Sequence, residues 1–147
     1  MSMKNVSLFI STFFYIGNVK VAPGTIASFF TILFWWFLMP LSFAPRLFFL
    51  VFLLIIAILT IEYSLKFFDE EDPQSIVIDE FIGMSIPMLF IVSNITLAVV
   101  AFIIFRFLDI FKPSIIYYSQ RYKRSMGILL DDILSGILTL LILANYL

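Results

Sequence analysis

Residues 46–68 read RLFFLVFLLIIAILTIEYSLKFF, and this stretch decides the fold class of the chain. Its charged residues are Arg46 at the start and Glu62 and Lys66 near the end. An α-helix rises about 1.5 Å per residue, so a helix of this length reaches across a hydrocarbon core of about 30 Å. A soluble helix would need a polar face, and this stretch has almost no side chains to form one. The stretch therefore predicts a membrane-spanning helix.

The composition of the whole chain extends this prediction beyond one helix. The 147 residues are 63% hydrophobic and 13% charged, and they include 19 phenylalanines. Soluble domains average about 45–50% apolar and about 25% charged residues. A soluble fold of this size cannot cover so many apolar side chains with the few polar ones available. We therefore expect residues 1–147 to form a single integral-membrane domain in contact with the lipid bilayer.

The apolar runs are separated by clear breaks, which give the expected membrane segments. These are residues 26–41, 46–68, 80–92, 95–111 and 128–146. The expected fold class is all-α, a polytopic membrane helical bundle of about four or five segments. Segment 80–92 is short and contains Pro87, which leaves open a re-entrant hairpin with segment 95–111 in place of two full crossings.

The N-terminal stretch predicts a different kind of helix. Residues Val6–Ile16 follow Lys4 and lack the small-residue cleavage site of a signal peptide. On a helix, the apolar side chains here share one face and the polar side chains lie opposite. The apolar set is Val6, Phe9, Ile10, Phe13 and Phe14, and the polar set is Ser7, Ser11 and Asn18. We expect an amphipathic helix in the membrane interface.

The charged residues predict the topology. An even number of crossings separates residues 17–25, 68–80 and 106–127 from one another, so these segments lie on the same side of the membrane. Eight of the nine basic residues fall on that side, and Arg46 is the exception. The eight are Lys4, Lys20, Lys66, Arg106, Lys112, Arg121, Lys123 and Arg124. Basic residues accumulate in cytoplasmic loops, so we expect this face, which also carries the acidic residues, to be cytoplasmic.

The residue types that are missing exclude several kinds of chemistry. The chain has no cysteine and no histidine. Thiolate nucleophiles, Ser-His-Asp catalysis, phosphohistidine intermediates and zinc sites built on Cys or His are therefore excluded. The net charge of −1 gives no basic face for nucleic acid. Any chemistry must use carboxylates, Lys, Arg, hydroxyls, backbone amides and a hard metal ion.

Residues 17–25 read GNVKVAPGT and form the first candidate site at the cytoplasmic face. Pro23, Gly24 and Thr25 are typical of a helix N-terminus with free backbone N–H groups. Such a terminus binds anions, and Lys20 lies close by in the sequence. A capped membrane helix without a ligand is the alternative.

Asp79 and Glu80 form the second candidate, between the apolar residues 76–78 and an apolar helix. The helix macrodipole favours carboxylates at this position, which is a sufficient structural explanation. Two adjacent carboxylates with Gly83 one turn later also suit a site for a hard cation. The preceding acidic residues 69–72 resemble a solvated loop and are assigned no chemistry.

Arg106, Asp109 and Lys112 recur every three residues and form one polar stripe at the end of a membrane helix. An Arg106–Asp109 pair with a purely structural role is one interpretation. Ionisable residues at the membrane boundary are costly and more often functional, however. Arg and Lys around a carboxylate also fit the recognition of phosphate.

Asp131 and Asp132 lie inside an apolar helix, one turn from its expected start. Two like charges there need a cation or a basic partner. A salt bridge to Arg106 or Lys112 is the structural alternative. Asp132 shares a helix face with Gly136, while Asp131 points aside. We favour a metal role, in which carboxylates converge from three helices.

Four segments in this order resemble the phosphatidylglycerophosphatase A family of bacterial membrane phosphatases. They are residues 22–28, 76–83, 105–113 and 127–136, and the resemblance extends over about residues 12–140. Ala27 departs from the glycine usual in that family. The resemblance implies Mg²⁺-dependent removal of the terminal phosphate of phosphatidylglycerol phosphate, giving phosphatidylglycerol in phospholipid biosynthesis. It also implies a multi-pass protein of the bacterial inner membrane whose active site faces the cytoplasm.

The expected roles combine this resemblance with the residue pattern. The metal ligands would be Asp79, Asp109 and Asp132. The catalytic residues would be Glu80 and Asp131, as a further ligand or general base, and Arg106 and Lys112, which would hold the phosphate oxygens. The substrate-binding residues would be Lys20, Gly24, Thr25 and Ser28.

Two other classes of protein remain open. A small ion or metal transporter would use the same carboxylates as a transit site, but the acidic residues crowd one face instead of the bilayer midplane. Glu62 lies well inside a span, and Lys66 one turn later is placed to pair with it. A non-catalytic scaffold subunit would have no need of the clustered aspartates.

Overall fold

The computed structural model describes residues 2–37, 42–70, 72–91, 94–112 and 124–147, and every regular element within them is helical. The α-helices are α1 Met3–Ser11, α2 Pro23–Phe37, α3 Phe43–Ser64, α4 Ile78–Ile91, α5 Ile95–Phe111 and α7 Ser125–Leu143. Short 3₁₀ turns are η1 Ile16–Asn18, η2 Leu65–Phe67 and η3 Ala144–Tyr146. The predicted all-α class is confirmed.

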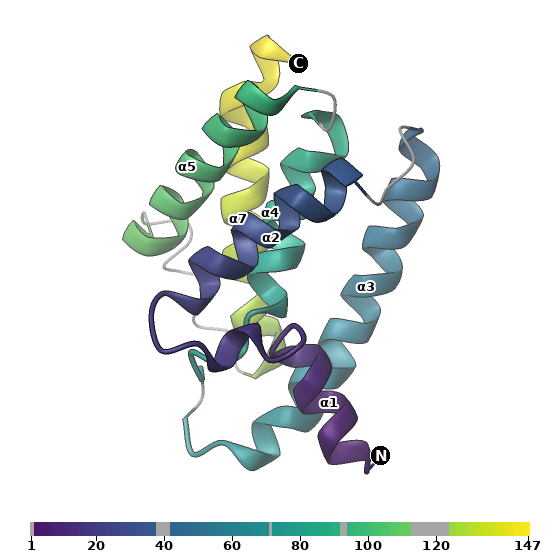
Figure 1. The fold of residues 1–147 in the computed structure, drawn as a ribbon, viewed down its shortest axis with the longest axis vertical. Coiled ribbons are helices and arrows are strands. Elements are labelled where there is room, and N and C mark those ends of the chain that lie inside the picture. Colours follow the sequence, from purple (N-terminus) through teal and green to yellow (C-terminus); the bar gives the residue numbers. More distant parts are fainter. Residues whose placement is uncertain (1, 38–41, 71, 92–93, 113–123) are drawn as a thin grey trace.

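Helix α4 is the centre of the bundle. Figure 1 shows α4 and α7 in the middle, with α5 and α3 to either side and α2 crossing over them. Helix α4 packs against all four of these helices, and eleven of its fourteen residues are buried. A helix that is apolar on all sides can be enclosed in this way. The carboxylates in its first turn are consequently held inside the protein.

Two glycines allow α4 and α7 to touch backbone to backbone. A Cβ atom added to Gly83 would lie 2.6 Å from the carbonyl oxygen of Asp132. A Cβ atom added to Gly136 would overlap the carbonyl oxygen of Gly83. Small residues are the usual means of close helix packing in membranes, where the hydrophobic effect does not press helices together. The α4–α7 crossing therefore depends on both glycines.

Two helices in the described part of the chain are long and apolar enough to cross a membrane. They cover Phe43–Phe67 and Ser125–Tyr146, and they match the predicted segments 46–68 and 128–146. Their outer surfaces carry large apolar side chains, and Phe48 is 75% exposed. Such surfaces suit contact with lipid and indicate a membrane-associated protein.

The remaining apolar helices are shorter than a full span requires. Helices α2, α4 and α5 have 15, 14 and 17 residues, against about 20 for a crossing. The count of four or five membrane segments therefore stays a prediction. Residues 38–41 of the first expected segment and residue 92 of the third lie outside the described residues.

Arg46 joins the start of α3 to the end of α4. Its side chain is buried, with Nε donating to the carbonyl of Ser42 at 3.1 Å and Nη1 to that of Met88 at 3.4 Å. Met88 belongs to the last turn of α4, where carbonyl groups lack partners within the helix. Arg46, the single basic residue expected on the far side of the membrane, thus supplies a hydrogen-bond donor to a carbonyl group at the end of α4.

The N-terminal helix is shorter than the predicted residues 6–16. Helix α1 ends at Ser11, and residues 13–15 all have φ between 45° and 67°. The Thr12 hydroxyl donates to the carbonyl of Leu8 at 2.7 Å. The Tyr15 N–H, which would bond the Ser11 carbonyl in a further helical turn, instead bonds the Thr12 hydroxyl at 3.2 Å, and the Ser11 carbonyl accepts from the Val77 N–H.

Two members of the predicted polar set turn inward in α1. Ser7 and Ser11 are buried, and the Ser11 hydroxyl lies 3.0 Å from that of Ser64 in α3. Asn18 lies outside the helix and is exposed, while Val6, Phe9 and Ile10 are half-buried. A helix that lies in the membrane interface therefore stays a prediction.

The substitution Gly136→Ala is expected to lower the free energy of unfolding by about 1–3 kcal/mol, because overpacking forces the α4 and α7 backbones apart. Thermal unfolding in detergent measures this change. The matched control is Ile137→Ala at the next position, which is 40% exposed and should unfold near the wild-type temperature. Equal unfolding temperatures for the two variants would contradict the packing role of Gly136.

Candidate metal and phosphate site

The starts of α2, α4 and α7 and the end of α5 meet around a cavity of about 380 Å³. Nine of the eleven site residues expected from the sequence line it. They are Lys20, Gly24, Asp79, Glu80, Arg106, Asp109, Lys112, Asp131 and Asp132. Segments far apart in the sequence therefore place their charged residues around one space.

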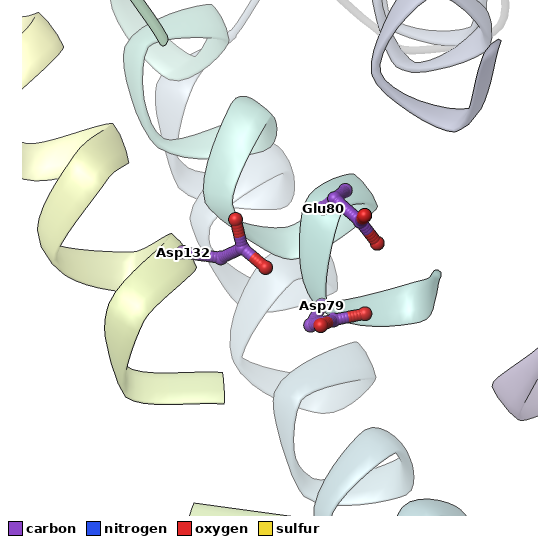
Figure 2. Close-up of side chains that lie close together, drawn as sticks. All are labelled: Asp79, Glu80 and Asp132. Atoms are coloured by element: carbon purple, nitrogen blue, oxygen red, sulfur yellow. The ribbon is translucent and has the colours of Figure 1, made fainter. Parts of the chain in front are cut away.

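Three carboxylates converge on one side of this cavity. Asp79 and Glu80 come from the first turn of α4, and Asp132 comes from α7. One carboxylate oxygen from each lies within 4.8 Å of the other two. Figure 2 shows Asp132 directed from α7 toward the start of α4, where Asp79 and Glu80 project. Oxygen ligands of this kind suit Mg²⁺ or Ca²⁺.

The glycine contact explains why these carboxylates meet. Asp79 precedes Gly83 by four residues, and Asp132 precedes Gly136 by four residues. Residues four apart lie on the same helix face, so each aspartate stands one turn from the glycine of its own helix. Because Gly83 lies directly against the backbone at Asp132, the two aspartates face the same space.

Unpartnered polar atoms gather at this site. In the described part of the chain, the buried side-chain atoms without a hydrogen-bond partner are Asp79 Oδ1, Glu80 Oε2, Asp132 Oδ1 and Arg106 Nε. Buried hydroxyls elsewhere are satisfied, as where Ser135 donates to the carbonyl of Asp131 at 2.8 Å. Buried polar groups without partners are costly, so their concentration here indicates a ligand. Three anionic oxygens and a guanidinium nitrogen fit a hard metal ion beside an anion.

Arg106 lies between the three converging carboxylates and Asp109. Its Nη1 donates to Asp109 Oδ2 at 2.6 Å and lies 4.0 Å from Glu80 Oε1. The Arg106–Asp109 pair considered as a structural alternative is therefore present. Gly24 packs against the side chains of Glu80 and Arg106, because an added Cβ would overlap Glu80 and approach Arg106 Nη1 to 3.3 Å. A larger residue at this position would force the Glu80 carboxylate to move.

Lys112 forms the second ion pair of the cavity. It ends α5 in a left-handed conformation, and its Nζ donates to Asp131 Oδ2 at 2.5 Å. Burial lowers the pKa of the Lys112 ammonium, but the hydrogen bond and the charge of Asp131 raise it by more, so the net shift is upward. The salt bridge considered as an alternative is thus present for Asp131. Among the described residues, Asp132 has no such partner.

Thr25 and Ser28 do not line the cavity. The Ser28 hydroxyl is buried and donates to the carbonyl of Gly24 at 2.8 Å, within α2. Asp109 lines the cavity but stands outside the converging carboxylate group, in which Glu80 takes its place. The structure thus brings the expected charged residues together around one cavity. The third carboxylate of the converging group is Glu80, where Asp109 was expected.

The sequence profile of the phosphatidylglycerophosphatase A family matches residues 9–146. The chain belongs to this family. The resemblance stated from the four sequence segments is confirmed, and with it the expectation of an enzyme of the phosphatase class. No solved structure matches the chain significantly.

Individual relatives agree with this membership. The chain is 34% identical to phosphatidylglycerophosphatase A of Escherichia coli strain K12 over 144 residues, which are 95% of this chain and 82% of the relative. It is 38% identical over 73 residues to phosphatidylglycerophosphatase A of Haemophilus influenzae. It is 34% identical over 77 residues to a Bacteroides thetaiotaomicron protein whose name refers to a phosphatidylinositol-3-phosphatase. The last two matches span about half of this chain and 45% and 48% of those relatives.

The sequence did not predict two of the polar residues that line the cavity, nor one of the ion pairs. Asp72 and Gln74 line the cavity, although the acidic loop they belong to was assigned no chemistry. Glu62 does not pair with Lys66 as predicted. It accepts hydrogen bonds from Arg124 at 2.6 Å and from the hydroxyl of Ser125 at 3.1 Å. One signal in the sequence pointed to Asp72, because this residue stands beside a proline and close to Asp79.

A double-mutant cycle tests the second ion pair of the cavity. The variants Lys112→Met, Asp131→Asn and their combination should show a coupling free energy of about 0.5–3 kcal/mol in unfolding experiments in detergent. The corresponding cycle for Arg124 and Glu62 is the control, since the Arg124 side chain is 75% exposed and should couple by less than about 1 kcal/mol. Strict additivity at Lys112 and Asp131 would show that their contact does not stabilise the fold.

Proposed function

We propose that this protein is a Mg²⁺-dependent phosphatidylglycerophosphatase that converts phosphatidylglycerol phosphate to phosphatidylglycerol in phospholipid biosynthesis. The observation that carries the proposal is the set of unpartnered carboxylate and guanidinium atoms around one charged cavity. Family membership and the names of two relatives support the choice of reaction. They do not support the ion-transporter alternative.

Asp79, Glu80 and Asp132 would hold the metal ion, because they lie close together and each has a buried oxygen without a hydrogen-bond partner in the described structure. Mg²⁺ bound there would supply Lewis acidity toward the phosphate group. Asp109 stays a predicted ligand, since it lines the same cavity while its carboxylate accepts from Arg106. The donor set contains only oxygens, which fits Mg²⁺ better than a softer metal.

The basic residues of the cavity would bind the phosphate. Arg106 has a free Nε directed into the buried region, and Lys112 and Lys20 line the same space. Cationic donors placed before the reaction stabilise the charge that develops on phosphoryl oxygens. Gly24 would contribute backbone rather than side-chain contacts at the start of α2, where N–H groups lack helical partners.

The reaction is the hydrolysis of a phosphate monoester. Water oxygen forms a bond to phosphorus, the bond from phosphorus to the terminal glycerol oxygen breaks, and that oxygen takes up a proton. The proton lost by the water would pass to a cavity carboxylate. Glu80 and Asp131 are the two candidates for this general base, and a Glu80 that ligates the metal would leave the role to Asp131, which accepts a hydrogen bond from Lys112.

The membrane setting would give the enzyme direct access to its lipid substrate. We place the protein in the bacterial inner membrane as a multi-pass protein, with the cavity at the cytoplasmic face. The apolar outer surfaces of α3 and α7 support burial in lipid, and the gathering of basic residues at the cavity end supports its orientation.

The substitution Asp132→Asn is expected to reduce phosphate release from phosphatidylglycerol phosphate by at least about 100-fold, because it removes a charged ligand. The measurement uses purified protein in detergent, with Mg²⁺ removed by a chelator and then restored. Asp69→Asn, an exposed carboxylate outside the cavity, is the matched control and should retain activity. Full Mg²⁺-dependent activity in Asp132→Asn would refute the metal assignment.

The same assay separates the candidate substrates. Phosphatidylglycerol phosphate should be hydrolysed faster than phosphatidic acid, phosphatidylinositol 3-phosphate and a soluble phosphomonoester. Faster release from phosphatidylinositol 3-phosphate would transfer the proposal to the activity named for the Bacteroides relative.

Cysteine labelling tests the topology on a chain that has no native cysteine. A membrane-impermeant maleimide should label Ser42→Cys on intact spheroplasts and Glu70→Cys only after permeabilisation. Both positions are exposed and lie at opposite ends of α3 and η2. The reverse labelling pattern would place the cavity on the outer side of the membrane.

A further inference from the structure

The position of Asp79 depends on a short segment without regular structure. Residues 75–77 lead directly into α4 and form no helix or strand of their own. Ile76 and Val77 are nevertheless 3% and 0% exposed. The residues that pack around this segment therefore determine the position of the Asp79 carboxylate.

Three contacts join this segment and α4 to residues 11–17, which begin at the last residue of α1. The N–H of Val77 donates to the carbonyl of Ser11 at 3.0 Å. Gly17 lies so close to the Ser75 carbonyl that an added Cβ would overlap it. The ring of Phe13 packs on that of Phe81, one turn into α4, with centroids 4.5 Å apart.

Residues 11–17 are themselves anchored from two further directions. The hydroxyl of Ser11 meets that of Ser64 in α3 at 3.0 Å, in a buried contact. The N–H of Gly17 donates to the carbonyl of Thr12 at 2.9 Å, which closes the turn on itself. The following turn η1 packs against α2.

We propose that residues 11–17 form an N-terminal clamp that positions Asp79 for metal binding. None of its residues reaches the cavity, so each is a positioning residue that acts through the chain on either side of Asp79. The proposal rests on the metal site of the proposed function. It assigns to the N-terminal region a role in metal binding at the start of α4.

The close approach at Gly17 is the most sensitive part of the N-terminal clamp. Gly17 does not have a positive φ, so alanine is compatible with its backbone and disturbs only the contact with Ser75. A shift of Ser75 is transmitted over four residues to Asp79. Metal ligands must lie within about 0.2 Å of their proper distances, so a small shift weakens the site.

The test measures Mn²⁺ binding by the electron paramagnetic resonance signal of free Mn²⁺, using full-length protein in detergent. Gly17→Ala should weaken Mn²⁺ binding roughly tenfold, in the range found for residues that orient metal ligands. Phe13→Ala should weaken it to a smaller extent. Thermal unfolding without metal shows whether each variant is folded.

The controls are the neighbouring substitutions Asn18→Ala and Val19→Ala, which lie outside residues 11–17 and whose side chains are exposed. Both should bind Mn²⁺ as the wild type does. Wild-type Mn²⁺ affinity in folded Gly17→Ala would overturn the proposal. If Gly17→Ala does not fold, wild-type affinity in Phe13→Ala overturns it instead.

Failure of the clamp and failure of the proposed function give different results. If the wild type binds Mn²⁺ and Gly17→Ala binds it weakly, but no lipid phosphate is released, the clamp stands and the proposed substrate is wrong. If lipid phosphate is released and all variants bind Mn²⁺ equally, the function stands and the clamp is wrong.

Discussion

The backbone contact between α4 and α7 is the constraint on which the site depends. Gly83 lies against the backbone of Asp132, and Gly136 lies against the backbone of Gly83. In a membrane, helices gain little from burying apolar side chains against each other, so close backbone packing has to hold them together. Because an aspartate stands one turn before each glycine, the interaction that joins the helices also brings Asp79 and Asp132 together. Packing and function therefore use the same two helix faces.

The buried charged groups of the site lower the stability of the helical bundle. Carboxylates and a guanidinium are buried at the end of an apolar bundle, and several of their atoms lack partners among the described residues. Burial of charge without compensation is unfavourable, and like charges close together add repulsion. Two ion pairs, from Arg106 to Asp109 and from Lys112 to Asp131, offset part of this cost. The carboxylates left over are those that a cation would neutralise, which is the physical basis for the metal assignment.

The sequence was sufficient for what depends on local pattern. Apolar run length predicted helices, and the absence of Cys and His limited the chemistry to carboxylates and a hard cation. What depends on the angles between helices was harder to predict. Glu80 joins Asp79 and Asp132 where Asp109 was expected, because Arg106 holds Asp109. The partner of Glu62, Arg124, lies 62 residues away immediately before α7, whereas the prediction considered only the next turn of its own helix. Likewise, α1 ends where Tyr15 and Val77 form hydrogen bonds with Thr12 and Ser11 that hydrophobic periodicity does not register.

The assignment of metal binding to Asp79, Glu80 and Asp132 can be tested directly by the anomalous diffraction of Mn²⁺ in crystals of the wild-type protein grown in lipid. We expect an anomalous peak within about 2–2.5 Å of carboxylate oxygens from these three residues. A peak coordinated instead by Asp109 and Asp131, or an active protein whose crystals show no metal at the three carboxylates, would contradict it.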